Sequence, residues 1–598
     1  MNSLCDAFAH TVLRVPDRIA LRSLGGEREL TWSDYAVEVA SRAAMLIELG
    51  VRPGQSVALM MGNCIEFHLL DTAIMHVGAV PVSIYNTLRP RDIAYILGNS
   101  GAKWVFAQSC YVSTLSEIDD EDACPAGIVS VDGTVIGATD LRCLLMHDTP
   151  LDLAQAAGRV RPQDLATISY TSGTTGPPKG VELSHEAILR SIAAIDDAFG
   201  VIDGARMVSF LPMAHVAERM FSHWRGITGG FTITPCPHPS EVGPYLLDVR
   251  PEYVFSPPRL FEKLRAAVEV RFDSECDPAQ RALNARGLQV GAAMLRYHEE
   301  GATAPDHLRK EFEGLGPTVF TPALASVGLD QTRVALTGSA PVPPELVRYL
   351  LAIGLPIFEG WGMSEVTAFG SFNRPGDTRA GTVGHPLCGA EIRLAEDGEI
   401  LFRSPWMMSG YRGQPELTAE TIGADGWLRT GDIGAYADGR LRIVDRKKEL
   451  IISSFGKNMS PSNIEFAVKS ASPLVGQVCV IGDAKPFVTA LIVVDSTVAD
   501  ALDGRRPDLP PHSDPAVLQA VESAVSAANT ELSQVERVKR HRVLDAEWLP
   551  GGDELSPTMK LKRRRILEKH HDIIEQLYSH QSHRSQQQLA CAAISIAQ

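Results

Sequence analysis

Residues 170–180, YTSGTTGPPKG, place three glycines, four Ser or Thr hydroxyls and one lysine in a single short stretch. The preceding residues, Leu165 to Tyr170, predict a short strand, and Ser184 is a suitable N-cap for a following helix. Between them we predict a flexible loop whose hydroxyls and backbone N–H groups can all point at one anion. Glycines allow the backbone to approach closely, and Lys179 adds a positive charge. The stretch therefore predicts a polyphosphate site.

Two other interpretations of this loop are weaker. Gly, Ser, Thr and Pro also compose ordinary solvated linkers, but the order of the residues here is far more specific than their composition. A Walker P-loop requires Gly directly before its lysine and Ser or Thr directly after it. This chain has Pro178 and Gly180 at those two positions, so the Walker pattern fails twice.

The composition is that of a soluble globular protein and argues against one class of partner. The chain has 598 residues, of which 45% are hydrophobic and 21% charged, enough for several domains with large cores. Its formal net charge of −16 argues against nucleic acid as the main partner, because phosphate backbones attract basic surfaces. Ten cysteines without CxxC pairs suit a reducing cytosol and indicate neither a zinc site nor a disulfide framework.

Neither a signal peptide nor a transmembrane helix is expected. The segment 1–21 has Asp6 and Pro16 where a signal peptide needs an unbroken apolar core. No window approaches about 18 uninterrupted apolar residues. We therefore expect a cytoplasmic protein, either a monomer or a homodimer, and the sequence leaves peripheral contact with a membrane open.

Alternating strand and helix patterns predict an α/β fold. Near the N-terminus the order is helix, strand, helix, strand, strand, over residues 31–50, 57–61, 65–76, 80–84 and 104–107. This βαβ arrangement favours a parallel or mixed sheet covered by helices. Residues 274–312 predict charged surface helices. Near the C-terminus, strands over 478–482 and 488–494 and a helix over 515–532 predict a small α+β unit.

Two motifs after the loop carry side chains suited to a substrate or a phosphate. Ser209 to Met220 reads SFLPMAHVAERM, where a strand delivers His215 to a loop, although a lone histidine is usually structural or simply exposed. Phe358 to Glu365 reads FEGWGMSE, in which an aromatic ring beside glycine can lie against a purine and Ser364 can donate to a phosphate. Glu365 can hold magnesium, which takes hard oxygen ligands. The structural alternative is a Ser N-cap with a Glu in the first helical turn.

Three further motifs lie elsewhere in the chain. Arg333 to Pro341 reads RVALTGSAP, a strand running into a Gly-Ser turn. Trp427 to Gly434 reads WLRTGDIG, where Asp432 offers two acceptor oxygens to the vicinal hydroxyls of a ribose, although TGD can also be an ordinary turn. Leu555 to Leu567 reads LSPTMKLKRRRIL, whose lysines would by themselves indicate only a solvated basic run.

Together these motifs resemble those of the acyl-adenylate-forming ligases, the superfamily of acyl-CoA synthetases, firefly luciferase and peptide-synthetase adenylation domains. The LP-x-AHV-x-ER pattern resembles the long-chain acyl-CoA synthetase branch. The resemblance spans roughly residues 5–575. It implies an α/β fold with a large N-terminal domain of helix-covered mixed β-sheets, including a β-barrel-like subdomain, over residues 1–444. A small mobile α+β C-terminal lid domain would follow over 445–578, and a disordered tail over 579–598.

The resemblance also implies a role for each motif residue. ATP phosphates would be bound by Thr171, Ser172, Gly173, Thr174, Thr175, Lys179 and Ser364. Adenine and ribose would be bound by Gly338, Ser339, Ala340, Glu359, Gly360, Trp361, Gly362, Asp432 and Arg446. Glu365 would hold Mg²⁺ and be catalytic, together with His215 and Lys560. Asp445 would be the hinge, and Gly456 would belong to a loop that turns inward for the second half-reaction.

Two residues depart from the common family pattern. Trp361 stands where Tyr is usual, and Met559 stands where many members have Gly before the catalytic lysine. The long-chain branch also uses a bulky residue at the second position, so we interpret Met559 as a marker of that branch. Lys560 is preferred over Lys562 as the catalytic lysine.

The implied reaction is the ATP- and Mg²⁺-dependent ligation of a medium-to-long-chain fatty acid to coenzyme A. An acyl-adenylate would be the intermediate, AMP and pyrophosphate would be released, and the lid would rotate between the two half-reactions. One alternative is a fatty acyl-AMP ligase that hands the acyl group to a carrier protein. Another is a non-catalytic acyl- or nucleotide-binding protein on the same fold, which we would expect to have lost Lys560, Glu365 or Asp432. Trp224 could gate an acyl tunnel or merely pack.

Overall fold

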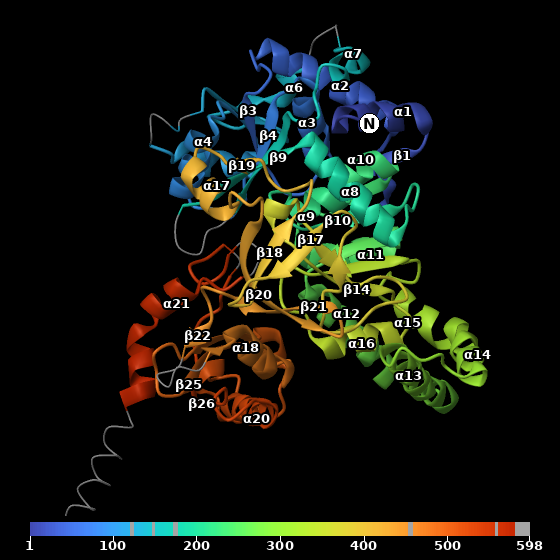
Figure 1. Ribbon diagram of the computed structural model, residues 1–598, viewed down its shortest axis with the longest axis vertical. Coiled ribbons are helices and arrows are strands. Elements are labelled where there is room, and N and C mark those ends of the chain that lie inside the picture. Colours follow the sequence, from blue (N-terminus) through green and yellow to red (C-terminus); the bar gives the residue numbers. More distant parts are fainter. Residues whose placement is uncertain are drawn as a thin grey trace, which may run out of the picture. The chain divides into compact units, whose positions relative to one another are not determined.

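The computed structural model describes residues 1–119, 123, 125–145, 150–171, 177–452, 458–549, 551–556 and 560–579. Figure 1 shows its helices and strands. Contacts along the chain divide it into two units. The first contains Met1–Thr430 and Gly434–Ile443, and the second contains Gly431–Ile433 and the described residues from Val444 onward. Each unit has its own hydrophobic clusters.

A five-stranded parallel sheet lies in the N-terminal part of the first unit, in the order β4-β3-β5-β6-β7. Its strands are β3 (Ser56–Met60), β4 (Val80–Ser83), β5 (Trp104–Ala107), β6 (Gly127–Ser130) and β7 (Thr139–Asp140). Helix α3 (Ile65–His76) joins β3 to β4, and α4 (Pro90–Ser100) joins β4 to β5. The central strands are almost continuously apolar, as expected where helices cover both faces. The predicted βαβ arrangement is confirmed.

Helix α2 (Trp32–Glu48) has the local sequence signals from which a helix over 31–50 was predicted. Thr31 and Asp34 form a reciprocal capping box at its start. The apolar side chains on one face of this predicted helix are buried, including Tyr35, Val39 and Ala43. The chain leaves the helix through Gly50, which has a φ of 79° that glycine adopts without strain.

Three further sheets have parallel or antiparallel neighbouring strands, and the third of them contains residues of both units. One has the order β10-β11-β1-β2, another β12-β13-β14-β15-β16, and a third β17-β18-β20-β21. The first comprises β1 (Ile19–Arg22), β2 (Glu29–Thr31), β10 (Arg206–Ser209) and β11 (Thr232–Pro235). The second comprises β12 (Tyr253–Ser256), β13 (Val334–Thr337), β14 (Ile357–Trp361), β15 (Ser371–Phe372) and β16 (His385–Pro386). The third comprises β17 (Glu391–Leu394), β18 (Glu399–Arg403), β20 (Leu428–Ala437) and β21 (Arg440–Arg446).

The segment after the phosphate loop is a strand and not the loop that the sequence predicted. Strand β9 (Lys179–Ser184) pairs antiparallel with β8 (Leu165–Thr171), so that Thr171 lies opposite Lys179. Its side chains alternate, and Val181 and Leu183 are fully buried. Because Gly and Pro residues precede this strand, its alternation of buried and less buried side chains was not recognised from the sequence. The predicted N-cap is confirmed, because Ser184 Oγ accepts from the Ala187 N–H at 3.1 Å and helix α8 (His185–Phe199) follows.

Helices cover the sheets of the first unit. They include α1 (Leu4–Arg14), α11 (Val242–Val249), α12 (Pro258–Asp273), α13 (Pro278–Glu299), α14 (Asp306–Leu315), α16 (Pro344–Ala352) and α17 (Pro415–Thr421). The charged surface helices predicted over 274–312 correspond to α13 and α14. Among the described residues, no helix combines the length and hydropathy needed to cross a membrane.

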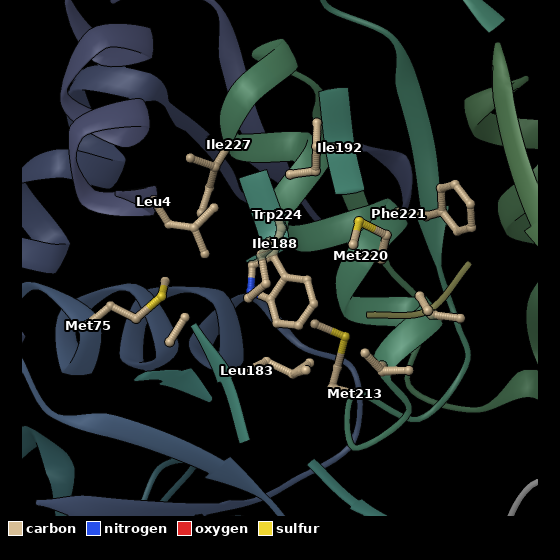
Figure 2. Packing of buried hydrophobic residues seen from close by; sticks show 14 of the residues in the cluster. Leu4, Met75, Leu183, Ile188, Ile192, Met213, Met220, Phe221, Trp224 and Ile227 are labelled. Atoms are coloured by element: carbon tan, nitrogen blue, oxygen red, sulfur yellow. The ribbon is translucent and has the colours of Figure 1, made fainter. Parts of the chain in front are cut away.

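The core around Trp224 joins elements that are far apart in the sequence. Figure 2 shows the Trp224 ring among Leu183, Ile188, Met213 and Met220. Trp224 ends a π-helical turn, Arg219–Trp224, and its side chain is fully buried. In this structure Trp224 therefore packs as a core residue.

The second unit is a small α+β assembly, as the sequence predicted. Its sheet has the order β24-β25-β26, formed by β24 (Val475–Ile481), β25 (Val488–Val494) and β26 (Val538–Val543). Helices α18 (Pro461–Ser470) and α20 (Pro515–Glu531) contribute to a common apolar core with these strands. Helix α21 (Arg563–Lys569) follows the predicted catalytic lysine. The tail predicted over 579–598 lies, except for Ser579, outside the described residues.

Candidate active site

Lys179 and Glu365 are brought together by a third side chain, Tyr411. The Lys179 ammonium lies 5.0 Å from the centroid of the Tyr411 ring, within the range of a cation–π contact. The Tyr411 hydroxyl donates to Oε1 of the Glu365 carboxylate at 2.7 Å. The sequence assigned this lysine and this glutamate to one phosphate and magnesium site, and the structure places both against the same aromatic ring.

Sequence reasoning missed Tyr411, because its place depends on a two-residue strand. Strand β19 (Gly410–Tyr411) pairs antiparallel with β9, with Tyr411 opposite Val181. Figure 1 shows β19 beside β9. Burial and the neighbouring Glu365 carboxylate raise the pKa of Tyr411 above its ordinary value. Its hydroxyl therefore stays protonated and remains a donor.

Glu365 is held by a turn that leaves little freedom. It lies in a short 3₁₀ helix, Ser364–Val366, preceded by Met363 at the N-cap position. Thr367 and Ala368 have φ values of 54° and 83°, in the left-handed region that side chains rarely adopt. A Cβ on Gly362 would lie 1.9 Å from the Ala368 carbonyl oxygen, so this position requires glycine. The structural alternative of a Ser364 N-cap does not describe this turn.

The predicted adenine-binding segments lie at the ends of neighbouring parallel strands. Gly338 follows β13, and β14 carries Glu359 to Trp361. A Cβ on Gly338 would meet the Gly360 carbonyl oxygen at 2.6 Å, so the two segments are in close contact. Ligands in α/β sheets commonly bind at the carboxyl ends of strands. The Ser339 φ of 65° marks the predicted Gly-Ser turn, and Ala340, which follows it, is exposed.

Two side chains of this region point into the protein. Trp361 is buried, and its ring meets the Phe402 ring edge-on with a centroid separation of 6.0 Å. Glu359 Oε2 accepts from the Gly381 N–H at 3.0 Å. Burial raises the pKa of Glu359 to about 8. Binding of adenine by these two residues stays a prediction.

His215 begins a tightly packed segment. Its main chain donates to the Pro212 carbonyl at 2.8 Å and accepts from the Arg219 N–H at 3.3 Å. Glu218 follows it, fully buried, with Oε2 accepting from the Leu211 N–H at 3.2 Å. Burial raises the pKa of Glu218 to about 7. The π-helical turn after Glu218 is a feature that is frequent at functional sites.

In the second unit, Asp432 and Arg446 form an ion pair. Arg446 Nε lies 3.1 Å from Asp432 Oδ1, and the Lys447 N–H donates to the Gly431 carbonyl at 2.8 Å. The Asp432 side chain is largely buried, whereas almost half of the Arg446 side chain is exposed. Both residues were predicted to contact the nucleotide, and they lie together on strands β20 and β21.

The predicted hinge, Asp445, is anchored to the start of a helix. Its carboxylate accepts from Ser460 Oγ at 2.5 Å and from Ser462 Oγ at 3.0 Å. Ser460 is itself the N-cap of α18 and accepts from the Asn463 N–H at 3.1 Å. Asp445 is therefore fixed to the start of α18.

Lys560 and Lys562 differ in their surroundings. The Lys560 N–H donates to Ser556 Oγ at 2.9 Å, and its carbonyl accepts from the Ser556 N–H at 2.8 Å. The Lys560 residue is exposed. Lys562 Nζ donates to the Gly552 carbonyl at 2.8 Å. The role of Lys560 as the catalytic lysine stays a prediction.

Arg563 differs from the solvated basic run that the sequence of this segment indicates by itself. Its guanidinium makes two hydrogen bonds to the carboxylate of buried Glu465, at 2.5 and 2.6 Å, and lies 3.4 Å from Glu449. A bidentate pair of this kind holds two elements together. Arg563 is thus a structural residue that joins α21 to α18.

Five predicted site residues lie outside the described residues. They are Ser172, Gly173, Thr174 and Thr175 of the phosphate loop, and Gly456 of the predicted thioesterification loop. Thr171 and Lys179, at the two ends of the phosphate loop, are described and lie opposite each other.

The residues present fit a magnesium ion that is held mainly by its substrate. Within the described residues, no group of three or more His, Cys, Asp or Glu side chains could hold a metal. Glu365 has one carboxylate oxygen bonded to Tyr411, and Ser364 lies next to it. Mg²⁺ commonly binds one or two carboxylates together with substrate phosphates and water, and this donor set suits that mode.

Two family models together match most of the chain. The AMP-binding enzyme model matches residues 8–412, and the AMP-binding enzyme C-terminal domain model matches residues 448–582. FadD15 of Mycobacterium bovis, a long-chain-fatty-acid–CoA ligase, is 32% identical over 586 residues, covering 94% of this chain and 95% of that protein. The Mycobacterium tuberculosis protein fadD11 is 42% identical over 449 residues, covering 74% of this chain and 78% of that protein.

Solved structures share the fold. The A-PCP didomain of carboxylic acid reductase from Segniliparus rugosus, in complex with AMP, matches with a TM-score of 0.72 and 18% identity, covering 100% of this chain and 85% of that chain. A Mycobacterium tuberculosis fatty acyl CoA synthetase matches with a TM-score of 0.60 and 21% identity, covering 95% of this chain and 98% of that chain. At these identities the likeness concerns the fold alone.

Proposed function

Because this chain belongs to the AMP-binding enzyme family, we propose that it activates a medium-to-long-chain fatty acid with ATP and transfers it to coenzyme A. The observation that carries the proposal is that Lys179, at the end of the phosphate loop, and Glu365 both contact Tyr411. A cation and a carboxylate held there suit the triphosphate and its metal. The long-chain-fatty-acid–CoA ligases among the relatives, which match nearly the whole chain, support the fatty acid as substrate.

In the first half-reaction an oxygen of the fatty acid carboxylate attacks the α-phosphorus of ATP. The bond to the pyrophosphate oxygen breaks, and the acyl-adenylate and pyrophosphate form. Two anions must approach each other, so the protein has to offset negative charge, and such electrostatic stabilisation is usually the largest catalytic contribution. Lys179, the loop hydroxyls and Lys560 would supply it. Positioning and charge suffice for this chemistry, and no side-chain nucleophile is required.

Mg²⁺, when bound, would neutralise charge on the phosphate oxygens. Glu365 would hold it through its carboxylate, with Ser364 beside it. Asp432 would accept hydrogen bonds from the ribose hydroxyls. Because Arg446 lies against one oxygen of that carboxylate, it would keep the Asp432 side chain oriented.

In the second half-reaction the sulfur of CoA attacks the acyl carbonyl of the mixed anhydride, and AMP leaves. The proposed C-terminal lid would turn about Asp445 between the two steps, taking Lys560 away and bringing the segment around Gly456 inward. Such a rearrangement separates two incompatible sites and keeps water from the intermediate. The proposed domain bounds are 1–444 and 445–578.

The direct test is exchange of labelled pyrophosphate into ATP. We expect exchange that depends on both a fatty acid and Mg²⁺ and that needs no CoA, because the first half-reaction is complete without it. Exchange that proceeds equally with and without a fatty acid would overturn the proposal.

A further inference from the structure

Lys179 and Glu365 carry opposite charges and share a neighbour, yet no direct ion pair joins them in the described part of the chain. The Tyr411 ring is in contact with the ammonium on one side, and its hydroxyl bonds the carboxylate on the other. A lysine and a glutamate in direct contact would form an ion pair, in which each charge offsets the other. Here one uncharged side chain contacts both of them.

The backbone on either side of Tyr411 fixes the position of its ring. The Tyr411 N–H donates to Thr418 Oγ1 at 2.9 Å. The Arg412 N–H donates to the Gly180 carbonyl at 2.7 Å, and the Met408 N–H donates to the Glu365 carbonyl at 2.9 Å. Residues 408–412 thus form a strap that is tied to the Glu365 turn at one end and to β9 at the other.

Two side-chain contacts reinforce this strap. Arg412 lies 3.2 Å from the Glu182 carboxylate, on the strand that carries Lys179. Thr418 Oγ1 also donates to the Gln414 carbonyl at 2.9 Å, so the acceptor for the Tyr411 N–H is itself held. Because both ends are tied, the backbone of Tyr411 cannot move away from Lys179 without breaking several of these hydrogen bonds.

We infer that Tyr411 is a positioning residue that keeps Lys179 and Glu365 apart and available for the triphosphate and its Mg²⁺. Its hydroxyl orients one oxygen of Glu365 and leaves the other for the metal. Its ring supports the Lys179 ammonium without neutralising it. This inference rests on the proposed function, since it assigns a task within the same site.

The test compares two substitutions that remove different halves of the side chain. Tyr411→Phe keeps the ring and removes only the donor to Glu365. We expect its half-saturating Mg²⁺ concentration to rise about tenfold, the order expected for a lost hydrogen bond to a charged group, with ATP binding in the absence of Mg²⁺ unchanged. Tyr411→Leu removes the ring as well, and we expect it to weaken ATP binding even without Mg²⁺.

The main readout is the calorimetric affinity for ATP across a Mg²⁺ series without fatty acid, which needs no turnover. Pyrophosphate exchange is measured in parallel. Tyr35→Phe is the matched control, because Tyr35 is a buried tyrosine whose hydroxyl donates to the His68 carbonyl at 2.9 Å within the helical core. It should lower stability without changing the Mg²⁺ dependence.

A wild-type Mg²⁺ dependence in folded Tyr411→Phe would overturn the inference. So would an equal change in the Tyr35→Phe control. If Tyr411→Phe does not fold, Thr418→Val removes the acceptor of the Tyr411 N–H and should shift the Mg²⁺ dependence in the same direction by a smaller factor. Absence of fatty acid-dependent exchange in the wild type would instead count against the proposed function, while the calorimetric comparison would still decide the role of Tyr411.

Discussion

At the scale of single residues, Lys560 is expected to act in only one of the two half-reactions. In the proposed mechanism it contributes charge only while the carboxylate attacks the α-phosphorus. Lys562 provides a comparison, because its ammonium bonds the Gly552 carbonyl. The two lysines are close in sequence, and they should have different effects on the reaction.

We predict that Lys560→Ala lowers the rate of adenylation by about 100-fold or more, the size of effect seen when one stabilising donor is removed. Conversion of supplied acyl-adenylate to acyl-CoA should stay within a few-fold of the wild type. Single-turnover measurements of each step check this. Lys562→Ala should affect stability more than either rate, and an equal loss of both half-reactions in Lys560→Ala would contradict the assignment.

Glu218 is a second residue with a measurable signature, in stability and not in rate. Burial raises its pKa to about 7 in the folded protein, whereas an exposed Glu titrates near pH 4.3. Between these values the folded state binds more protons than the unfolded state. The free energy of unfolding that Glu218 contributes therefore falls as the pH rises through this interval.

We predict that Glu218→Gln removes this pH dependence. The difference in unfolding free energy between variant and wild type should move in favour of the variant by about 3 kcal/mol from pH 4.5 to pH 8. Denaturant titrations at pH 4.5, 6 and 8 check this, and other titrating groups cancel because both proteins share them. Parallel curves for the two proteins would show that Glu218 is ionised in the folded state.

At the scale of elements, the start of α18 depends on the residue proposed as the hinge. Asp445 accepts from both Ser460 and Ser462, and Ser460 caps the helix. A rotation at Asp445 would therefore carry α18 with it. The structure divides between Ile443 and Val444, one residue before Asp445, so we propose that the pivot lies on the N-terminal side of the Asp445 side chain.

We predict that Asp445→Ala destabilises the second unit by about 1–3 kcal/mol, because Ser460 and Ser462 lose a charged partner. Hydrogen exchange at the first turn of α18 should accelerate, while exchange in the five-stranded sheet stays unchanged. Asp503→Ala, at an exposed aspartate of the same unit, is the control. Unchanged exchange at Ser462 and Asn463 in Asp445→Ala would show that the cap does not depend on this carboxylate.

Elements with strong local signals were predictable from the sequence, and those set by distant pairing were not. Helix α3 and strand β5 occupy the predicted residues, because apolar patterns and turn residues mark them. Strand β9 was missed because Gly and Pro precede it and its partner β19 has only two residues. Tyr411 was missed for the same reason, since its register with β9 places it in contact with both Lys179 and Glu365.

At the scale of the whole molecule, the motifs lie on two units that each have a core of their own. The phosphate loop lysine and Glu365 belong to the first unit, and Asp432, Arg446 and Lys560 belong to the second. The order of motifs predicted the family because each motif carries chemistry of its own. The length of the acyl chain had no such signal, since residues such as Trp224 and Met213, which pack in the core (Figure 2), look like any other apolar residues in sequence.

The most direct test of the account is ATP consumption with a series of fatty acids of increasing length, with and without CoA, with AMP and acyl-CoA detected by mass spectrometry. We predict that acyl-CoA forms with AMP only when CoA is added, with a clear optimum in chain length. Acyl-adenylate that accumulates and never reaches CoA would contradict the CoA ligase and indicate transfer to a carrier protein. No turnover with any fatty acid would contradict the assignment of a fatty acid substrate.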